Sequence, residues 1–203
     1  MPDELLPLFP LGVVLFPNTR LPLHIFEDRY KEMIGEAVAQ GSEFGIVLAV
    51  DRGLVNAGCT ARVLRVPEKY PDGRLDILTL GARRFEIESL DQERNFLRAE
   101  VSYFDDELSD GRVDLRRRAT EVFQEAFPGE RDFAVDFAEP LLSFQLAQAL
   151  PDLSAKQIFL QMRNENDRLR RLIELLPELK GRQEITERMR TLAPRNGHGK
   201  HLR

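Results

Sequence analysis

The sequence has no tryptophan and a single cysteine, Cys59, among its 203 residues. One cysteine cannot form an internal disulfide or a cysteine-based metal cluster, and a lone thiol suits a reducing compartment. Long hydrophobic runs are also missing, since the longest has about five residues and a membrane-spanning helix needs about 20. The first twelve residues contain two acids and three prolines, where a secretory signal would have a basic end and an unbroken apolar core. We therefore expect a cytoplasmic protein with no transmembrane segment and no export signal.

Motifs of the common enzyme classes are absent as well. The sequence contains no G-x-x-x-x-G-K-[ST] phosphate loop, no G-x-G-x-x-G fingerprint, no H-E-x-x-H zinc motif and no G-x-S-x-G elbow. We therefore expect no catalytic residues, no metal and no cofactor. His24 is the one histidine outside the C-terminal tail, and its alternation with Leu23 and Ile25 predicts a structural or surface role. Cys59 has no cation or histidine nearby in sequence to lower its pKa, so we interpret it as a small buried hydrophobic residue.

The charge is unevenly distributed. The formal net charge is −5, but residues 1–107 carry 12 basic and 19 acidic side chains, and residues 108–203 carry 17 and 15. An acidic first half counts against nucleic-acid binding, because each phosphate contact needs a cation. The basic clusters at residues 116–118 and 168–171 are predicted to be solvated helix faces with acidic neighbours. Arg83 and Arg84 could bond anions or carbonyls, although a strand end or the carboxylates of a nearby hairpin are favoured.

The first half of the chain has the pattern of a β-rich unit. The segment from Leu6 to Phe16 is interrupted by prolines, so it should form a strand that is irregular or lies at an edge of the sheet. Residues 28–40 have helical spacing instead, with the apolar positions Tyr30, Met33, Ile34, Ala37 and Val38, and Gly41 should close that helix.

Further strands follow this helix. A buried strand is predicted at residues 44–48, and the turn at residues 71–74 predicts a hairpin from about Cys59 to Leu80. Two more alternating strands are predicted at residues 85–90 and 96–103. The first half therefore contains about six strands and one helix.

The second half has a helical period from Ser109 onwards. A first helix, capped near Ser109 or Asp110, should stop at Pro128, and a second should run from Pro140 to Pro151. Ser154 has capping-box spacing at the start of a third, and a fourth should be interrupted by Pro177. Four helices with short loops predict a small antiparallel bundle. We thus expect a β-rich domain at residues 1–107, a helical subdomain at 108–193 and a mobile basic tail at 194–203.

Four spaced blocks of sequence together resemble one known domain family. They are LPLFPLGVVLFPNTRLPLHIFEDRYKEM from Leu6, GCTARV from Gly58, DGR from Asp72 and GARRF from Gly81. Together with Gln157 and the Asp167-Arg168-Leu169 segment, they resemble the Lon protease N-terminal domain, the LON substrate-binding domain, over about residues 5–176. The resemblance implies a PUA-like pseudo-barrel followed by helices, which agrees with the elements expected above. No segment resembles the ATPase module or the Ser-Lys protease module of Lon, so the sequence predicts a stand-alone, non-enzymatic member of this family.

Two functions from different classes follow. The first is a non-catalytic module that binds a polypeptide or protein partner on apolar and edge-strand surface, where strand addition is one mode. Its candidate exposed contacts are Phe16, Pro17, Tyr70 and Pro71. The alternative, suggested by the PUA-like architecture, is a nucleic-acid-binding module, which the acidic first half disfavours.

Overall fold

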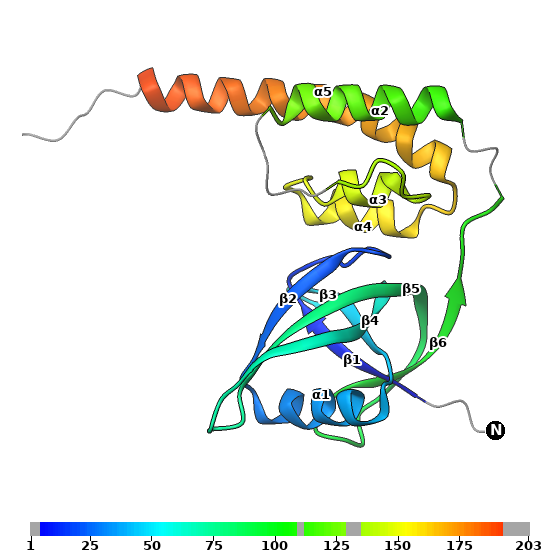
Figure 1. Ribbon diagram of the computed structural model, residues 1–203, viewed down its shortest axis with the longest axis vertical. Helices are drawn as coiled ribbons and strands as arrows, with labels where there is room; N and C mark the ends of the chain where they lie inside the picture. The colour runs from blue at the N-terminus through cyan, green and yellow to red at the C-terminus, as the bar shows by residue number, and fades with distance from the viewer. Residues whose placement is uncertain (1–4, 109–111, 129–134, 193–203) are drawn as a thin grey trace, which may run out of the picture.

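The computed structural model describes residues 5–108, 112–128 and 135–192, with side chains as far as Gly181. A β unit with one helix lies below a layered group of helices (Figure 1). The strands within these residues are β1 Leu6–Leu11, β2 Arg20–Ile25, β3 Phe44–Val50, β4 Gly53–Lys69, β5 Leu75–Asp91 and β6 Arg98–Phe104. The helices are α1 Asp28–Gln40, α2 Val113–Ala126, α3 Leu142–Ala147, α4 Leu153–Gln161 and α5 Glu165–Leu192. The expected β-rich unit followed by helices is confirmed.

The six described strands form one mixed sheet that closes on itself. Its order is β2-β5-β4-β3-β1-β6, and β5 also pairs with β6. Five strands, β1 and β3 to β6, therefore close a barrel. Strand β2 pairs with residues 75–80 of β5, which come before the part of β5 that pairs with β6. Strand β1 pairs in parallel with β3 and antiparallel with β6. The expectation that this proline-containing strand could be an edge is wrong, because it has neighbours on both sides; the irregular part is the segment of residues 12–19 that follows it.

The predicted hairpin is confirmed and is longer than expected. Its two strands have 17 residues each, and the segment around Phe85 continues β5 instead of forming a separate strand. The residues after β1 lie directly over β5 at Gly81, where the Asn18 amide donates to the Gly81 carbonyl at 3.0 Å. A Cβ atom on Gly81 would lie 2.1 Å from the Phe16 carbonyl oxygen, so this approach requires glycine.

Helix α1 covers the lower end of the barrel (Figure 1). Its bounds match the predicted ones, and Gly41 ends it with φ 64° and an amide that donates to the Ala37 carbonyl. Four of the five expected apolar residues are buried: Tyr30, Met33, Ile34 and Ala37. Val38 is not, since 45% of its surface is exposed at the end of the helix.

The helical part has two layers, with α3 and α4 facing the barrel and the packed pair α2 and α5 above them (Figure 1). Asp152, not Ser154, caps α4, because its carboxylate accepts from the Ala155 amide at 2.6 Å. Pro177 lies inside α5 and does not interrupt it. Buried Leu172 and Leu176 carry the apolar face up to this proline, so tertiary packing compensates for the missing amide.

Two other helix expectations need comment. Arg112 occupies the position before α2 and makes no side-chain cap, while the candidate caps Ser109 and Asp110 lie outside the described residues, as does the tail at 194–203. Helix α3 spans six residues and is shorter than predicted.

A shared hydrophobic core joins the barrel to the helices. The rings of Phe16 and Phe144 stack with centroids 5.2 Å apart, and the Gln157 side chain donates to the Ala57 carbonyl of β4 at 2.8 Å. A smaller cluster fills the barrel with Leu6, Leu8, Val47, Phe85 and Ala99. None of the helices in the described ranges is long and apolar enough to cross a membrane.

Candidate polypeptide-binding surface

Part of the sheet extends beyond the closed barrel. Strand β3 pairs with β4 only as far as Ala61, and β6 pairs with β5 only from Arg84 onwards. Residues 62–69 of β4, residues 75–80 of β5 and all of β2 form a three-stranded sheet that we name the arm. The arm ends in the hairpin tip at the lower left of Figure 1, on the side of the barrel away from β6.

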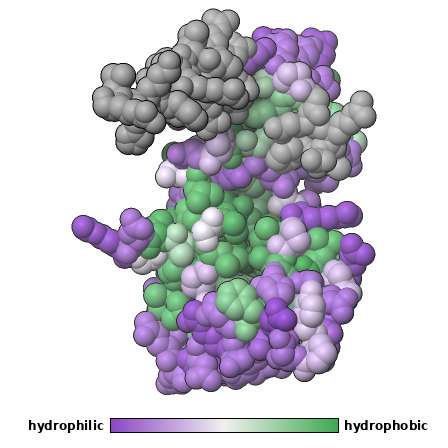
Figure 2. All heavy atoms as spheres, turned by 90° about the vertical axis from the view of Figure 1, so that its left-hand side faces the viewer, coloured by the Kyte–Doolittle hydropathy of each residue, from purple (hydrophilic) through white to green (hydrophobic). Residues whose placement is uncertain are grey.

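The outer face of the arm carries an open groove, which we name the outer groove. Pro22 lies opposite Leu78, which lies opposite Arg65, so these three residues share one face of the sheet. The groove has a volume of about 460 Å³. It is lined by Pro22, Leu23, His24, Arg65, Pro67, Asp76, Ile77 and Leu78. Figure 2 looks onto this side of the molecule and shows apolar side chains gathered between the helical part and a polar base.

A polar and aromatic rim borders the outer groove. Asp76 receives hydrogen bonds from His24 Nδ1 at 2.6 Å and from the Tyr70 hydroxyl at 2.8 Å. These bonds, first that of His24 and then that of Tyr70, hold the pKa of Asp76 below its usual value. The hydrogen bond from the Tyr70 hydroxyl to Asp76 also raises the pKa of Tyr70. Among the described side chains, Asp76 is the one hydrogen-bond partner of His24, and the two groups form part of this rim.

A second groove runs beside the free edge of β4. It has a volume of about 250 Å³ and is lined by five consecutive β4 residues, 62–66, and by the end of α1. Leu64, Val66 and Val38 are 43%, 38% and 45% exposed there. Apolar side chains therefore remain accessible along a strand segment that, in the part of the chain the structure describes, pairs with β5 alone.

The structure separates the four residues expected to contact a polypeptide. Phe16 is fully buried against Phe144, and Pro17 is buried beside it, so the expectation that these two are exposed is wrong. Helix α3 covers them, which a proline-rich segment alone does not reveal. Tyr70 is partly buried at the hairpin tip and Pro71 is exposed. These two remain predictions for contact.

Residues that the sequence left unassigned line the two grooves: Pro22, Leu64, Val66, Pro67 and Leu78. The hairpin predicted from about Cys59 to Leu80 includes the strand that carries Leu64 and Val66. That prediction did not indicate that β3 stops pairing at Ala61 and exposes the strand beyond it.

Cys59 lies on β4 and does not line either groove. It is fully buried, and burial raises the pKa of its thiol to about 12. The interpretation as a small hydrophobic residue is confirmed. Within the described part of the chain, no three His, Cys, Asp or Glu residues are placed to hold a metal ion.

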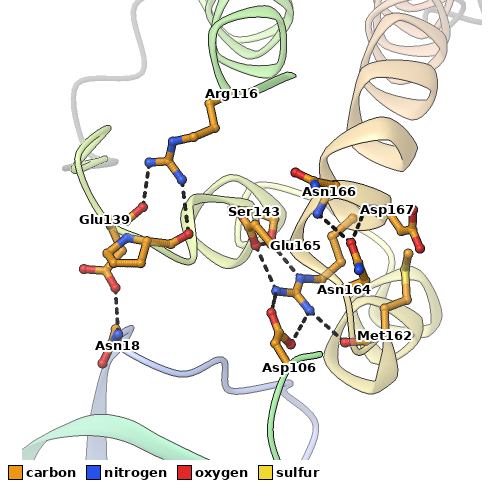
Figure 3. Close-up of polar contacts among 12 residues, drawn as sticks. Asn18, Asp106, Arg116, Glu139, Ser143, Met162, Asn164, Glu165, Asn166 and Asp167 are labelled. Atoms are coloured by element: carbon orange, nitrogen blue, oxygen red, sulfur yellow. Dashed lines mark hydrogen bonds and ion pairs between the residues drawn. The ribbon is translucent and has the colours of Figure 1, made fainter. Parts of the chain in front are cut away.

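Two buried arginines join the β unit to the helices. Arg168 was expected on a solvated face but is 0% exposed. Its Nε donates to the Ser143 hydroxyl at 2.8 Å, and its two terminal nitrogens bond Asp106, Glu165 and the Met162 carbonyl (Figure 3). Arg84 of β5 donates to the same Asp106 at 2.5 Å. We name Arg84, Asp106, Ser143, Glu165 and Arg168 the arginine joint.

The arginine joint satisfies its buried charges internally. Arg84 also donates to the carbonyls of Leu160 and Met162, which is the carbonyl alternative considered for this residue. Burial opposes ionisation of Asp106, yet the hydrogen bonds and charges of the two arginines outweigh it and hold the pKa of the carboxyl below its usual value. The joint therefore fixes the helices over the barrel instead of presenting a free charge to a ligand.

The remaining basic clusters are mixed in their environments. Arg116 is partly buried and donates to the carbonyls of Glu139 and Pro140 (Figure 3). It also donates to the carbonyl of Phe137 at 2.9 Å. Its neighbours pair with Glu121 on the exposed helix face, as expected. Arg83 pairs with Glu43 at 3.0 Å.

Comparisons with known proteins agree over most of the chain. A family model described as the ATP-dependent protease La (LON) substrate-binding domain matches residues 5–178. The Lon protease of Flavobacterium johnsoniae is 26% identical over 211 residues, which cover 91% of this chain and 26% of that protein. Lon protease 1 of Hydrogenovibrio crunogenus is 24% identical, over 88% of this chain and 24% of its own length. The chain thus spans about a quarter of the length of these curated relatives.

Solved structures show the same fold. The crystal structure of a Lon N-terminal domain protein from Xanthomonas campestris gives a TM-score of 0.68 at 28% identity, covering 84% of this chain and 98% of that one. The N-terminal domain of a Mycobacterium avium complex Lon protease gives 0.62 at 18% identity, with coverages of 86% and 98%. The second likeness supports the fold alone.

Proposed function

This chain belongs to the family of LON substrate-binding domains, and from that premise we propose that it is a polypeptide-binding module with no ATPase or protease activity of its own. The observation that carries the proposal is the arm, where two open grooves flank the same free strand. The proposal includes a division into residues 1–107 and 108–193, supported by the change from strand to helix between Phe104 and Val113. It places the module in the cytoplasm, a reducing compartment that suits its lone cysteine.

The outer groove offers the chemistry that an unfolded segment needs. Pro22, Pro67 and Leu78 present apolar surface, and burying such surface contributes about 25 cal/mol per Å². The exposed ring of Phe26, 60% accessible, stacks beside His24 and extends the apolar area towards the hairpin tip. A folded protein keeps its apolar side chains inside, whereas an unfolded segment can place them here.

The proposal is tested by binding of a permanently unfolded polypeptide. We expect labelled, reduced and carboxymethylated α-lactalbumin to bind the full chain in fluorescence anisotropy, and the native form of that protein to bind at least about tenfold more weakly. The variant Leu78→Asp should weaken binding by a similar factor, because it places a charge in the outer groove.

The matched control is Ile158→Asp on α4, a residue that is 50% exposed and distant in sequence from the arm. It should leave binding unchanged, and circular dichroism checks that both variants fold. Equal binding of the native and unfolded forms, or no binding of either, overturns the proposal. Retention of RNA that survives added salt, with no polypeptide bound, would favour the nucleic-acid alternative.

A further inference from the structure

We propose that the polypeptide binds as an added strand along residues 62–66 of β4, and that the preferred segment alternates acidic and apolar residues. The inference rests on the proposed function and names the mode and the class of its ligand. Three observations on the described residues carry it: a strand edge with no neighbour among them, an apolar groove beside that edge, and cations on it that form no ion pair with a described side chain.

The first observation is the free edge. Beyond Ala61, β4 pairs with β5 alone, and in the described ranges no other backbone group bonds residues 62–66 from the opposite side. An unpaired edge presents a row of amides and carbonyls that an extended chain can bond. Pro67 donates no amide, so the useful edge ends with Val66, the last β4 residue that lines the groove.

The second observation is the groove between this edge and α1. Leu64 and Val66 share it with Val38 at the end of the helix, and all three are exposed. Alternate side chains of an added strand point to the same face of the sheet. Every second side chain of the ligand would therefore contact this apolar groove.

The third observation concerns charge. Arg62 lies opposite Leu80 and Arg65 lies opposite Leu78, so both arginines stand on the same face of the β4–β5 pair, and both also border the groove beside α1. Neither forms an ion pair with any described side chain, whereas Arg83 and Arg94 pair with carboxylates. The ligand side chains that alternate with the apolar ones would lie beside these two cations, and carboxylates fit there.

The same cations argue against a second copy of this chain as the occupant. Pairing two copies along this edge would bring arginines of one copy next to arginines of the other, and like charges across strands are destabilising. An acidic segment of a different protein does not meet this charge repulsion.

The test uses defined peptides and the full chain. We expect a labelled octapeptide of alternating Glu and Val to bind at least about tenfold more tightly than the same peptide with Lys in place of Glu. N-methylation of one alternating set of its amides should weaken binding by about tenfold, and methylation of the other set by less than about twofold, because only alternate residues bond a neighbouring strand.

Charge reversal identifies the edge. The double variant Arg62→Glu and Arg65→Glu should prefer the Lys peptide. The control, Arg52→Glu with Arg171→Glu, changes two exposed arginines elsewhere by the same charge and should keep the original preference. Equal loss from both methylated sets, or an unchanged preference in the first double variant, overturns the inference.

The outcomes separate this inference from the proposed function. If the unfolded polypeptide binds but the peptides show no alternation and no charge preference, strand addition fails and polypeptide binding stands. If sedimentation shows that the chain forms dimers and that the Glu peptide dissociates them, the occupant is a second copy and the inference is wrong.

Discussion

The guanidinium of Arg168 is enclosed by protein and uses all of its donors. Its five N–H groups are matched by five hydrogen bonds to Asp106, Ser143, Met162 and Glu165. The ring of Phe144 lies 4.1 Å from the guanidinium carbon. A charge buried in this way depends on its partners, and each partner depends on the charge.

Replacing Arg168 by methionine should lower the free energy of unfolding by about 3–5 kcal/mol, because it leaves the buried carboxylate of Glu165 and the partly buried one of Asp106 without this cation. Urea unfolding followed by circular dichroism measures the change. The control is Arg170→Ala, which removes an exposed partner of Asp167 and should cost less than about 0.5 kcal/mol. Similar losses in the two variants would show that the joint contributes little.

The acid sensitivity of the joint should depend on Asp106. Its folded pKa lies below its unfolded value of about 3.9, so the ionised carboxylate stabilises the fold above that pH. This stabilisation is lost as the pH falls through the folded pKa. The difference in unfolding free energy between the natural chain and Asp106→Asn should therefore shrink on acidification below about pH 4. A difference that stays constant with pH in urea titrations would contradict this role.

Local sequence could not reveal the joint. Asp106 and Arg168 lie 62 residues apart, and Arg84 comes from a different strand. The run of charged residues around Arg168 has the pattern of an exposed helix face, and Arg170 does pair there with Asp167 as that pattern predicts. Burial of one member of the cluster is decided by which elements fold over it.

At the scale of elements, local sequence signals predicted an element correctly where contacts with distant segments did not override them. Helix α1 could be bounded from its apolar period and Gly41, because both its stripe and its stop lie within the segment. The position of β1 could not, because its neighbours β3 and β6 come from distant parts of the chain. Pro177 likewise predicted an interruption that the packing of α5 against α2 overrides.

The start of α4 offers a direct test of a capping assignment. Asp152→Ala should destabilise the chain by about 1 kcal/mol, since it removes the acceptor of the Ala155 amide. Ser154→Ala, at the position favoured by the capping-box spacing, should change stability by less than about 0.5 kcal/mol. Thermal or urea unfolding of the two variants distinguishes the caps. A larger loss of stability in Ser154→Ala than in Asp152→Ala would show that Ser154 is the cap.

At the scale of the whole molecule, the joint and the stacked pair Phe16 and Phe144 connect the two predicted units. The arm packs on the shared core through Ile25 and Ile77, while its free edge and outer face carry the open grooves. The division of the chain into strands and helices was predictable from the change in period. The free edge was not, since it depends on where β3 stops pairing with β4.

We expect the β unit and the helices to unfold in one transition. The chain has no tryptophan, and its three tyrosines, at positions 30, 70 and 103, all lie in the β unit. Tyrosine fluorescence therefore follows the β unit, while far-ultraviolet circular dichroism follows mainly the helices. The two urea curves should coincide, as they do for a cooperative transition. Separate midpoints in the natural chain would show that the joint does not couple the units, and Arg168→Met should move the curves apart.

The unbroken length of β5 has a mechanical consequence. Leu78 in the outer groove and Arg84 in the joint lie six residues apart on this one strand, a span of about 20 Å. A pull on a polypeptide held by the arm would travel along β5 as shear on its hydrogen-bond ladder, past the register shift between Gly81 and Arg84. The barrel anchors one end of the arm, so tension on a captured segment would reach the helices through Arg84.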